Sequence, residues 1–113
     1  MEIKDKDYEE VSLTAFVTAY PRRYTDILYE KEINDWIENN CRIDVVLNKE
    51  LAPEIEARCK LIDRLLDESK IKQVLELAGG YSSRGLRYCN NGYEYVEMDL
   101  PGIIYKKKEI IEG

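Results

Sequence analysis

Two adjacent glycines and an acidic residue about 20 positions later have types and spacing that suggest chemistry. Gly79-Gly80 follow a short apolar run, and Asp99 ends the next such run. A glycine turn after a strand lets the backbone approach a ligand, and the following helix presents free N–H groups toward it. An acid at the end of the second strand can accept hydrogen bonds from two ribose hydroxyls. The pattern indicates a nucleoside-binding turn, but A-G-G-Y-S-S-R-G is not the full G-x-G-x-x-G fingerprint. A turn that only connects strand to helix remains the alternative.

Two acids compete for the ribose-binding position. Glu97 and Asp99 are two residues apart in a strand, so their side chains point to the same side and either could reach the turn. Ligands of open α/β sheets bind at the carboxyl ends of the strands. Asp99 stands at that end, and we therefore prefer it.

Residue types exclude several other chemistries. The chain has no histidine, which removes Ser-His and Cys-His nucleophilic arrangements, and no catalytic residue can be assigned. Cys41, Cys59 and Cys89 are odd in number and widely spaced, so they suit no structural zinc site and we expect no metal. Free thiols are typical of a reduced, cytoplasmic protein.

Charge and hydropathy exclude two classes of partner. With 17 basic and 23 acidic residues the net charge is -6, which disfavours binding to nucleic-acid phosphates. The basic run Lys106-Lys107-Lys108 precedes Glu109 and Glu112, and we interpret it as the solvated face of a helix. No apolar run approaches the ~20 residues that cross a bilayer, so no membrane association is expected.

The elements that must position the glycine turn form an α/β unit in residues 70–113. Residues 71–78 and 93–98 have strand composition, and a short helix from Ser82-Ser83 lies between them. A helix over 102–111 follows, with Pro101 in its first turn. Strand, helix and strand predict two parallel strands joined by a right-handed crossover, the first βαβ unit of a Rossmann-like sheet.

Residues 1–69 read as a helical N-terminal segment. We expect a helix from Ser12 through Ala19, an interruption at Pro21, and a second helix restarting at Thr25-Asp26.

A third helix is expected to run from Asp44 to Asp67, kinked or divided at Pro53. Within it, Arg58 and Asp63 are interpreted as members of structural ion pairs.

Four segments in the same order resemble a known family. VLELAGGYSSRGLRY, YVEMDLPGIIYKKKEII, SLTAFVTAYPRR and ARCKLID resemble motifs of the leucine carboxyl methyltransferase family of class I S-adenosylmethionine-dependent O-methyltransferases. The resemblance implies an arginine that meets the cofactor carboxylate, with Arg23 as the alternative to Arg22. It implies that Ser82 stands where many members carry Asp, and that Arg84 is as readily structural as functional. The implied cofactor-binding residues are Arg22, Gly79, Gly80, Tyr81 and Asp99.

The resemblance implies a cofactor, S-adenosylmethionine, and leaves the methyl acceptor unknown. Family members have a seven-stranded sheet, of which this sequence supplies two strands, so we expect a truncated methyltransferase. The isolated chain would then be inactive, or would form a homo-oligomer or pair with a complementary chain, because exposed strand edges invite pairing. A non-catalytic interaction module and a nicotinamide-binding domain are the competing hypotheses.

Overall fold

The computed structural model describes residues 14–43 and 45–112 as a mixed helical and stranded fold. Ser12 and Asp44, expected to begin helices, lie outside the described residues. None of the helices in the described ranges is long and apolar enough to cross a membrane. Residues 14–19 are helical, and the elements that follow are η1 (Tyr20–Tyr24), α2 (Glu30–Asn40), α3 (Ala52–Ser69), β1 (Gln73–Leu77), α4 (Arg84–Cys89), β2 (Glu94–Met98) and α5 (Pro101–Glu112).

The two strands are parallel, as predicted. Their register runs from Gln73 opposite Glu94 to Leu77 opposite Met98, and α4 connects them. The Ala78 N–H donates to the Met98 carbonyl at 2.8 Å, so the pairing continues one residue past β1. This places the carboxyl ends of both strands, and hence the predicted glycine turn and acid, at the same edge of the sheet.

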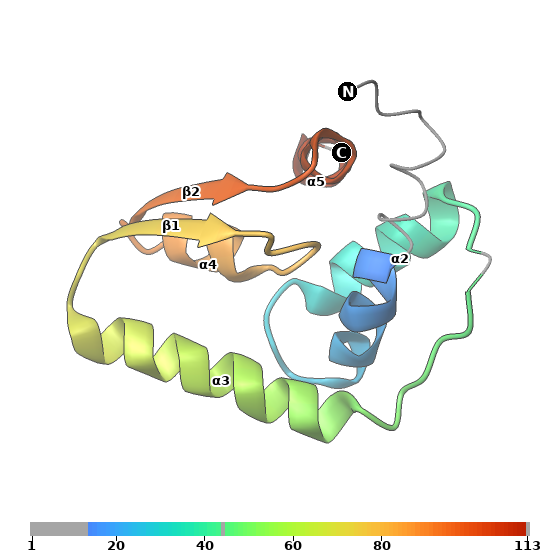
Figure 1. Cartoon of the computed structure of the whole chain (residues 1–113), viewed down its shortest axis with the longest axis horizontal. Helices are drawn as coiled ribbons and strands as arrows, with labels where there is room; N and C mark the ends of the chain where they lie inside the picture. Colours follow the sequence, from blue (N-terminus) through green and yellow to red (C-terminus); the bar gives the residue numbers. More distant parts are fainter. Residues whose placement is uncertain (1–13, 44, 113) are drawn as a thin grey trace.

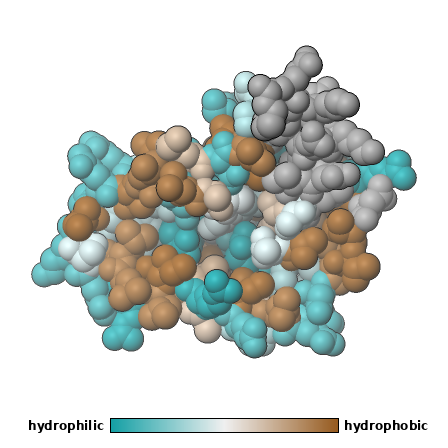
Figure 2. Space-filling model, viewed as in Figure 1, coloured by the Kyte–Doolittle hydropathy of each residue, from teal (hydrophilic) through white to brown (hydrophobic). Residues whose placement is uncertain are grey.

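The sheet has an unusual distribution of side chains between its two faces. Glu76 and Glu97 lie on the face that α4 covers, where a Cβ on Gly85 would stand 2.6 Å from Glu97 Oε1. The opposite face carries apolar side chains that are 57–67% exposed, and Figure 2 shows hydrophobic residues gathered over the region of the strands. An uncovered apolar sheet face normally packs against another element. These exposed residues are Leu75, Leu77, Val96 and Met98.

The hydrophobic core lies beyond the strand ends. In Figure 1 the arrowheads of β1 and β2 point toward α2 and the helical N-terminal segment, while α3 runs beneath the strands. The core therefore joins the N-terminal segment to the turn after β1 and to α5. Its buried members are Phe16, Ala19, Ile33, Ile37, Tyr81 and Ile103.

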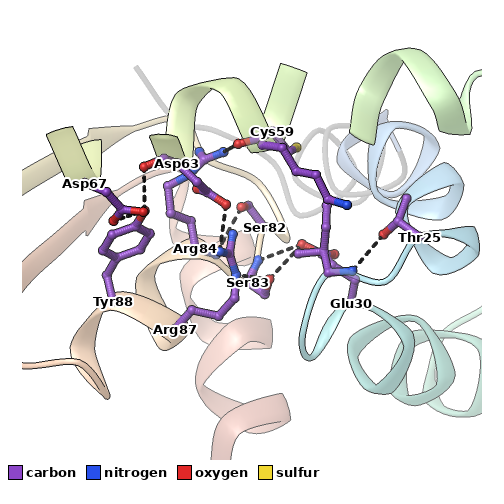
Figure 3. A network of polar contacts seen from close by, with 12 residues as sticks. Thr25, Glu30, Cys59, Asp63, Asp67, Ser82, Ser83, Arg84, Arg87 and Tyr88 are labelled. Atoms are coloured by element: carbon purple, nitrogen blue, oxygen red, sulfur yellow. Dashed lines mark hydrogen bonds and ion pairs between the residues drawn. The ribbon is translucent and has the colours of Figure 1, made fainter. Parts of the chain in front are cut away.

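A buried carboxylate links the same two parts of the chain. Glu30, 1% exposed, accepts a hydrogen bond from Arg22 Nε at 3.1 Å. Its other oxygen accepts from the N–H and the hydroxyl of Ser83, at 3.0 and 2.9 Å (Figure 3). Ser83 directly precedes α4, so one side chain joins η1, α2 and the start of α4.

The predicted start of the second helix was wrong. α2 begins at Glu30 rather than at Thr25, after Tyr29 in a left-handed backbone conformation (φ 71°). Thr25 closes η1 instead, since its N–H donates to the Arg22 carbonyl at 3.1 Å. A non-glycine residue with positive φ interrupts a helix, and the sequence carries no signal for one at Tyr29.

The predicted kink at Pro53 was also wrong. α3 begins at Ala52, which puts Pro53 in the first turn. A first-turn N–H has no carbonyl partner within the helix, so proline is tolerated there without bending it.

We expect Glu30→Ala to lower the free energy of unfolding by about 3–5 kcal/mol, because it leaves the Arg22 guanidinium buried and unpaired. Chemical denaturation measures this loss. Glu32→Ala is the matched control, since Glu32 is an exposed glutamate in the same helix, and its effect should stay within about 0.5 kcal/mol. Equal effects of the two substitutions would contradict the role given to Glu30.

Candidate functional site

The glycine turn and the acid at the end of β2 lie in direct contact. The Gly80 N–H donates to Asp99 Oδ2 at 2.8 Å, and the Leu100 N–H donates to Asp99 Oδ1 at 2.7 Å. Ala78 and Gly80 both have positive φ, 54° and 58°. Asp99 therefore holds the turn in a backbone shape that few residues other than glycine adopt readily.

Gly79 is required by a close approach within the turn. A Cβ at this position would stand 2.7 Å from Cδ of Glu76, which is nearer than real Cβ contacts come. The backbone here can thus lie against the Glu76 carboxylate only with glycine. The glycine pair serves two separate needs, a close contact at Gly79 and a left-handed backbone at Gly80.

A cleft of about 380 Å³ opens beside this turn. The N-terminal segment, α3 and the carboxyl end of β1 form its walls. Of the five predicted cofactor-binding residues, Arg22 and Gly79 line this cleft, whereas Gly80 and Asp99 are not among its lining residues. Its lining residues are Thr18, Arg22, Ile55, Arg58, Cys59, Ile62, Glu76, Leu77, Ala78, Gly79, Ser82 and Arg84.

The structure distinguishes the two arginines that the sequence left open. Arg22 reaches the cleft, although Glu30 and the Thr18 carbonyl already accept hydrogen bonds from its guanidinium, at 3.1 and 3.3 Å. Arg23 instead pairs with Asp35 at 2.6 Å on α2. Of Arg22 and Arg23, only Arg22 lines this cleft and can meet a ligand there.

Tyr81 and Glu97 do not face the cleft. The Tyr81 side chain is 2% exposed and belongs to the hydrophobic core, so any contact of Tyr81 with a ligand there would come from its backbone. Glu97 turns toward α5, where Lys107 Nζ lies 3.0 Å from its Oε1. Of the two candidate acids, Asp99 alone meets the glycine turn.

The expectation that the lysine run is solvated was wrong for Lys107. Its side chain is 11% exposed and is paired with Glu97. Burial of a long lysine side chain is favourable here because its ammonium finds a carboxylate at the end of an apolar path.

Two cleft residues were not predicted. Among the described residues Arg58 has no hydrogen bond or ion pair, although it lines the cleft from α3. The expected partner, Asp63, is occupied by Arg84 and Arg87. Glu76 Oε1 is buried with no hydrogen-bond partner in the structure. The motif ARCKLID contains Arg58, and the lone charge in VLEL is Glu76, so both had a signal in the sequence.

An ion network on the other side of Glu76 fixes α4. Arg84 Nε lies 2.7 Å from Asp63 Oδ1, and Figure 3 shows these two residues together. Arg84 Nη1 lies 3.0 Å from Glu76 Oε2. Burial lowers the pKa of Arg84, but the hydrogen bond and charge of Asp63, with those of Glu76, raise it above the usual arginine value. The geometry thus favours the structural reading of Arg84.

The described residues supply no metal centre. No group of three or more His, Cys, Asp or Glu side chains in these ranges is placed to hold an ion. The arrangement offers a cleft of mixed polar and apolar lining that includes Gly79, the unpaired guanidinium of Arg58 and the carboxylate of Glu76.

Comparison with protein-family models, curated proteins and solved structures found no match to this chain. The class that the fold defines is therefore the coarse one, a small α/β unit with two parallel strands.

We expect Arg84→Met to lower the free energy of unfolding by about 3–5 kcal/mol, since it leaves Asp63 and Glu76 short of their buried counter-charge. Thermal or chemical denaturation measures the loss. Arg64→Met is the control, because Arg64 pairs with Glu68 at 2.9 Å while 75% exposed, and such pairs contribute about 0–1 kcal/mol. A small effect of Arg84→Met would show that the network does not hold α4.

Proposed function

We propose that this chain forms the S-adenosylmethionine-binding part of an O-methyltransferase of the leucine carboxyl methyltransferase type. The observation that carries the proposal is the contact between the Gly80 N–H and the Asp99 carboxylate at the carboxyl ends of two parallel strands. This edge is where open α/β sheets bind nucleosides. An acid fixed there has oxygen lone pairs left for ribose hydroxyls, because a carboxylate has about four acceptor sites and Asp99 uses two.

The cleft residues fit the amino-acid end of the cofactor. That end carries a carboxylate and an ammonium group. Arg58 offers a guanidinium with no partner among the described residues, and guanidinium forks suit carboxylates. Glu76 also lines the cleft, and its carboxylate charge suits the ammonium. Gly79 lines the same cleft, with its backbone against the Glu76 carboxyl.

The chemistry asked of this chain is positioning. S-adenosylmethionine supplies a methyl group already activated by its sulfonium. The chain's own residues bind the ribose through Asp99, orient the amino-acid end through Arg58 and Glu76, and narrow the cleft with Arg22. Orientation of this kind lowers a transfer barrier without a histidine base. The methyl acceptor is not specified by these residues.

Calorimetric titration with S-adenosylmethionine tests the proposal. We expect saturable binding by the wild-type chain, and at least a tenfold weaker affinity for Arg58→Ala and Asp99→Ala, because a hydrogen bond to a charged group contributes about 1.5–3 kcal/mol. Arg58 makes no hydrogen bond or ion pair within the described residues, so its removal reports on the ligand more than on folding.

Arg64→Ala, on the exposed part of the same helix, is the matched control and should bind like wild type. Absence of binding by the folded wild-type chain would contradict the proposal. Tighter binding of NAD than of S-adenosylmethionine would favour a nicotinamide-binding domain instead.

A second candidate function is that of an interaction module. It is favoured by the uncovered face of the sheet, where four large apolar side chains are more than half exposed beside two strands with unpaired edges. A two-stranded sheet is marginal alone, and another chain can add to its edge. We propose that this face mediates self-association if the chain acts without catalysis.

We expect wild-type protein to form dimers or larger species, and Leu75→Lys to shift them toward monomer, because a charge would have to be buried against the partner. Light scattering over a range of concentrations measures this. Leu28→Lys is the matched control, since Leu28 and Leu75 are each 59% exposed and Leu28 belongs to the loop between η1 and α2 rather than to a strand. A wild-type chain that is monomeric throughout would exclude the interaction module.

A further inference from the structure

Glu76 and Glu97 are neighbours on the covered face of the sheet. They are register partners in β1 and β2, so their backbones lie about 4.8 Å apart and their side chains leave the same face. Both are pressed between the sheet and adjacent glycines, since a Cβ on Gly79 would meet Glu76 and one on Gly85 would meet Glu97. Both carboxyls are largely enclosed, with side-chain exposures of 13% for Glu76 and 23% for Glu97.

The basic side chains around Glu76 and Glu97 supply hydrogen bonds to only some of the four carboxylate oxygens. Arg84 of α4 binds Glu76 Oε2 at 3.0 Å, and Lys107 of α5 binds Glu97 Oε1 at 3.0 Å. Glu76 Oε1 remains buried with no hydrogen-bond partner. Asp63 of α3 also pairs with the Arg84 guanidinium, so the positive charge of Arg84 is shared between two carboxylates. One oxygen of the pair thus lacks a donor.

A proton on Glu97 would supply that donor. A protonated carboxyl has one O–H that can reach a neighbouring carboxylate oxygen, and two buried carboxylates side by side rarely both ionise. We propose that Glu76 and Glu97 hold one proton between them, so that the sheet edge beside the cleft responds to pH. This inference rests on contacts within the chain and does not require that the cleft binds a nucleoside.

Electrostatics of the pair agree with the geometry. Burial raises the pKa of Glu97, the charge of Lys107 and its hydrogen bond lower it, and the nearby Glu76 raises it further, with a net rise above the usual glutamate value. Tyr95 of β2 faces the same carboxylates, and burial followed by the charge of Glu76 raises the pKa of its hydroxyl. Tyr95 therefore stays a neutral hydroxyl at neutral pH and is the competing donor to Glu76.

The sign of the pH effect follows from the raised pKa of Glu97. The folded state binds the proton more tightly than the unfolded state does. Its stabilising contribution is therefore fully present below the ordinary glutamate range, and it is lost as the pH rises through the raised folded value. Since Glu76 also lines the cleft, proton loss makes that wall of the cleft more negative.

Denaturation across pH, with Glu97→Gln as the matched variant, tests the inference. The glutamine amide keeps the shape and donates to Glu76 Oε1 at every pH. We expect the folding equilibrium constant of wild type to fall, relative to Glu97→Gln, by up to tenfold per pH unit while Glu97 loses its proton. Parallel pH profiles for the two proteins would overturn the proposal.

Two further measurements separate the donors. Tyr95→Phe should keep the wild-type pH profile, whereas loss of the profile in this variant would assign the donor to Tyr95 and overturn the shared proton. Carbon-13 NMR of the glutamate carboxyls in the wild-type chain needs no variant to fold. The Glu97 signal should titrate above the ordinary glutamate range, and a titration within that range would reject the proposal.

Discussion

The charged atoms of Glu30 are the contact on which the arrangement of this chain depends. One of its oxygens accepts a hydrogen bond from Arg22 of η1, and the other accepts from Ser83, which directly precedes α4. Burying a carboxylate is favourable only where both charge and lone pairs find partners, so each of these elements needs the others in place. The apolar core packs around the same junction, with Phe16 and Tyr81 from its two sides. The cleft exists because this junction holds the N-terminal segment against the end of β1.

Ion pairs, rather than apolar side chains alone, hold the helices against one face of the sheet. Lys107 of α5 pairs with Glu97 of β2, and Arg84 of α4 pairs with both Glu76 of β1 and Asp63 of α3. Glu97 and Glu76 are register partners in the sheet. Such contacts are directional, so they fix α4 and α5 over one face of the sheet with defined geometry. On this face the two glutamates lie beside Val74 and Tyr95, whereas Leu75, Leu77, Val96 and Met98 lie on the other face.

The sequence predicted the strand pair, the short connecting helix and the glycine turn, because Gly79-Gly80 and the apolar runs are local signals. It failed at Tyr29 and Pro53, where a left-handed residue and a first-turn proline depend on tertiary packing. In the site, the contact of Asp99 with Gly80 agrees with the spacing in the sequence. The expected ion pair of Arg58 was wrong. Asp63 instead pairs with Arg84, 21 residues away, and no local pattern in the sequence shows this.

The exposed face of the sheet has a thermodynamic consequence. The heat capacity change of unfolding grows with the apolar area that unfolding newly exposes, and is about 12–15 cal/mol/K per residue in ordinary domains. Leu75, Leu77, Val96 and Met98 already meet water in the folded chain and contribute little to this change. A smaller heat capacity change flattens the curve of stability against temperature around its maximum.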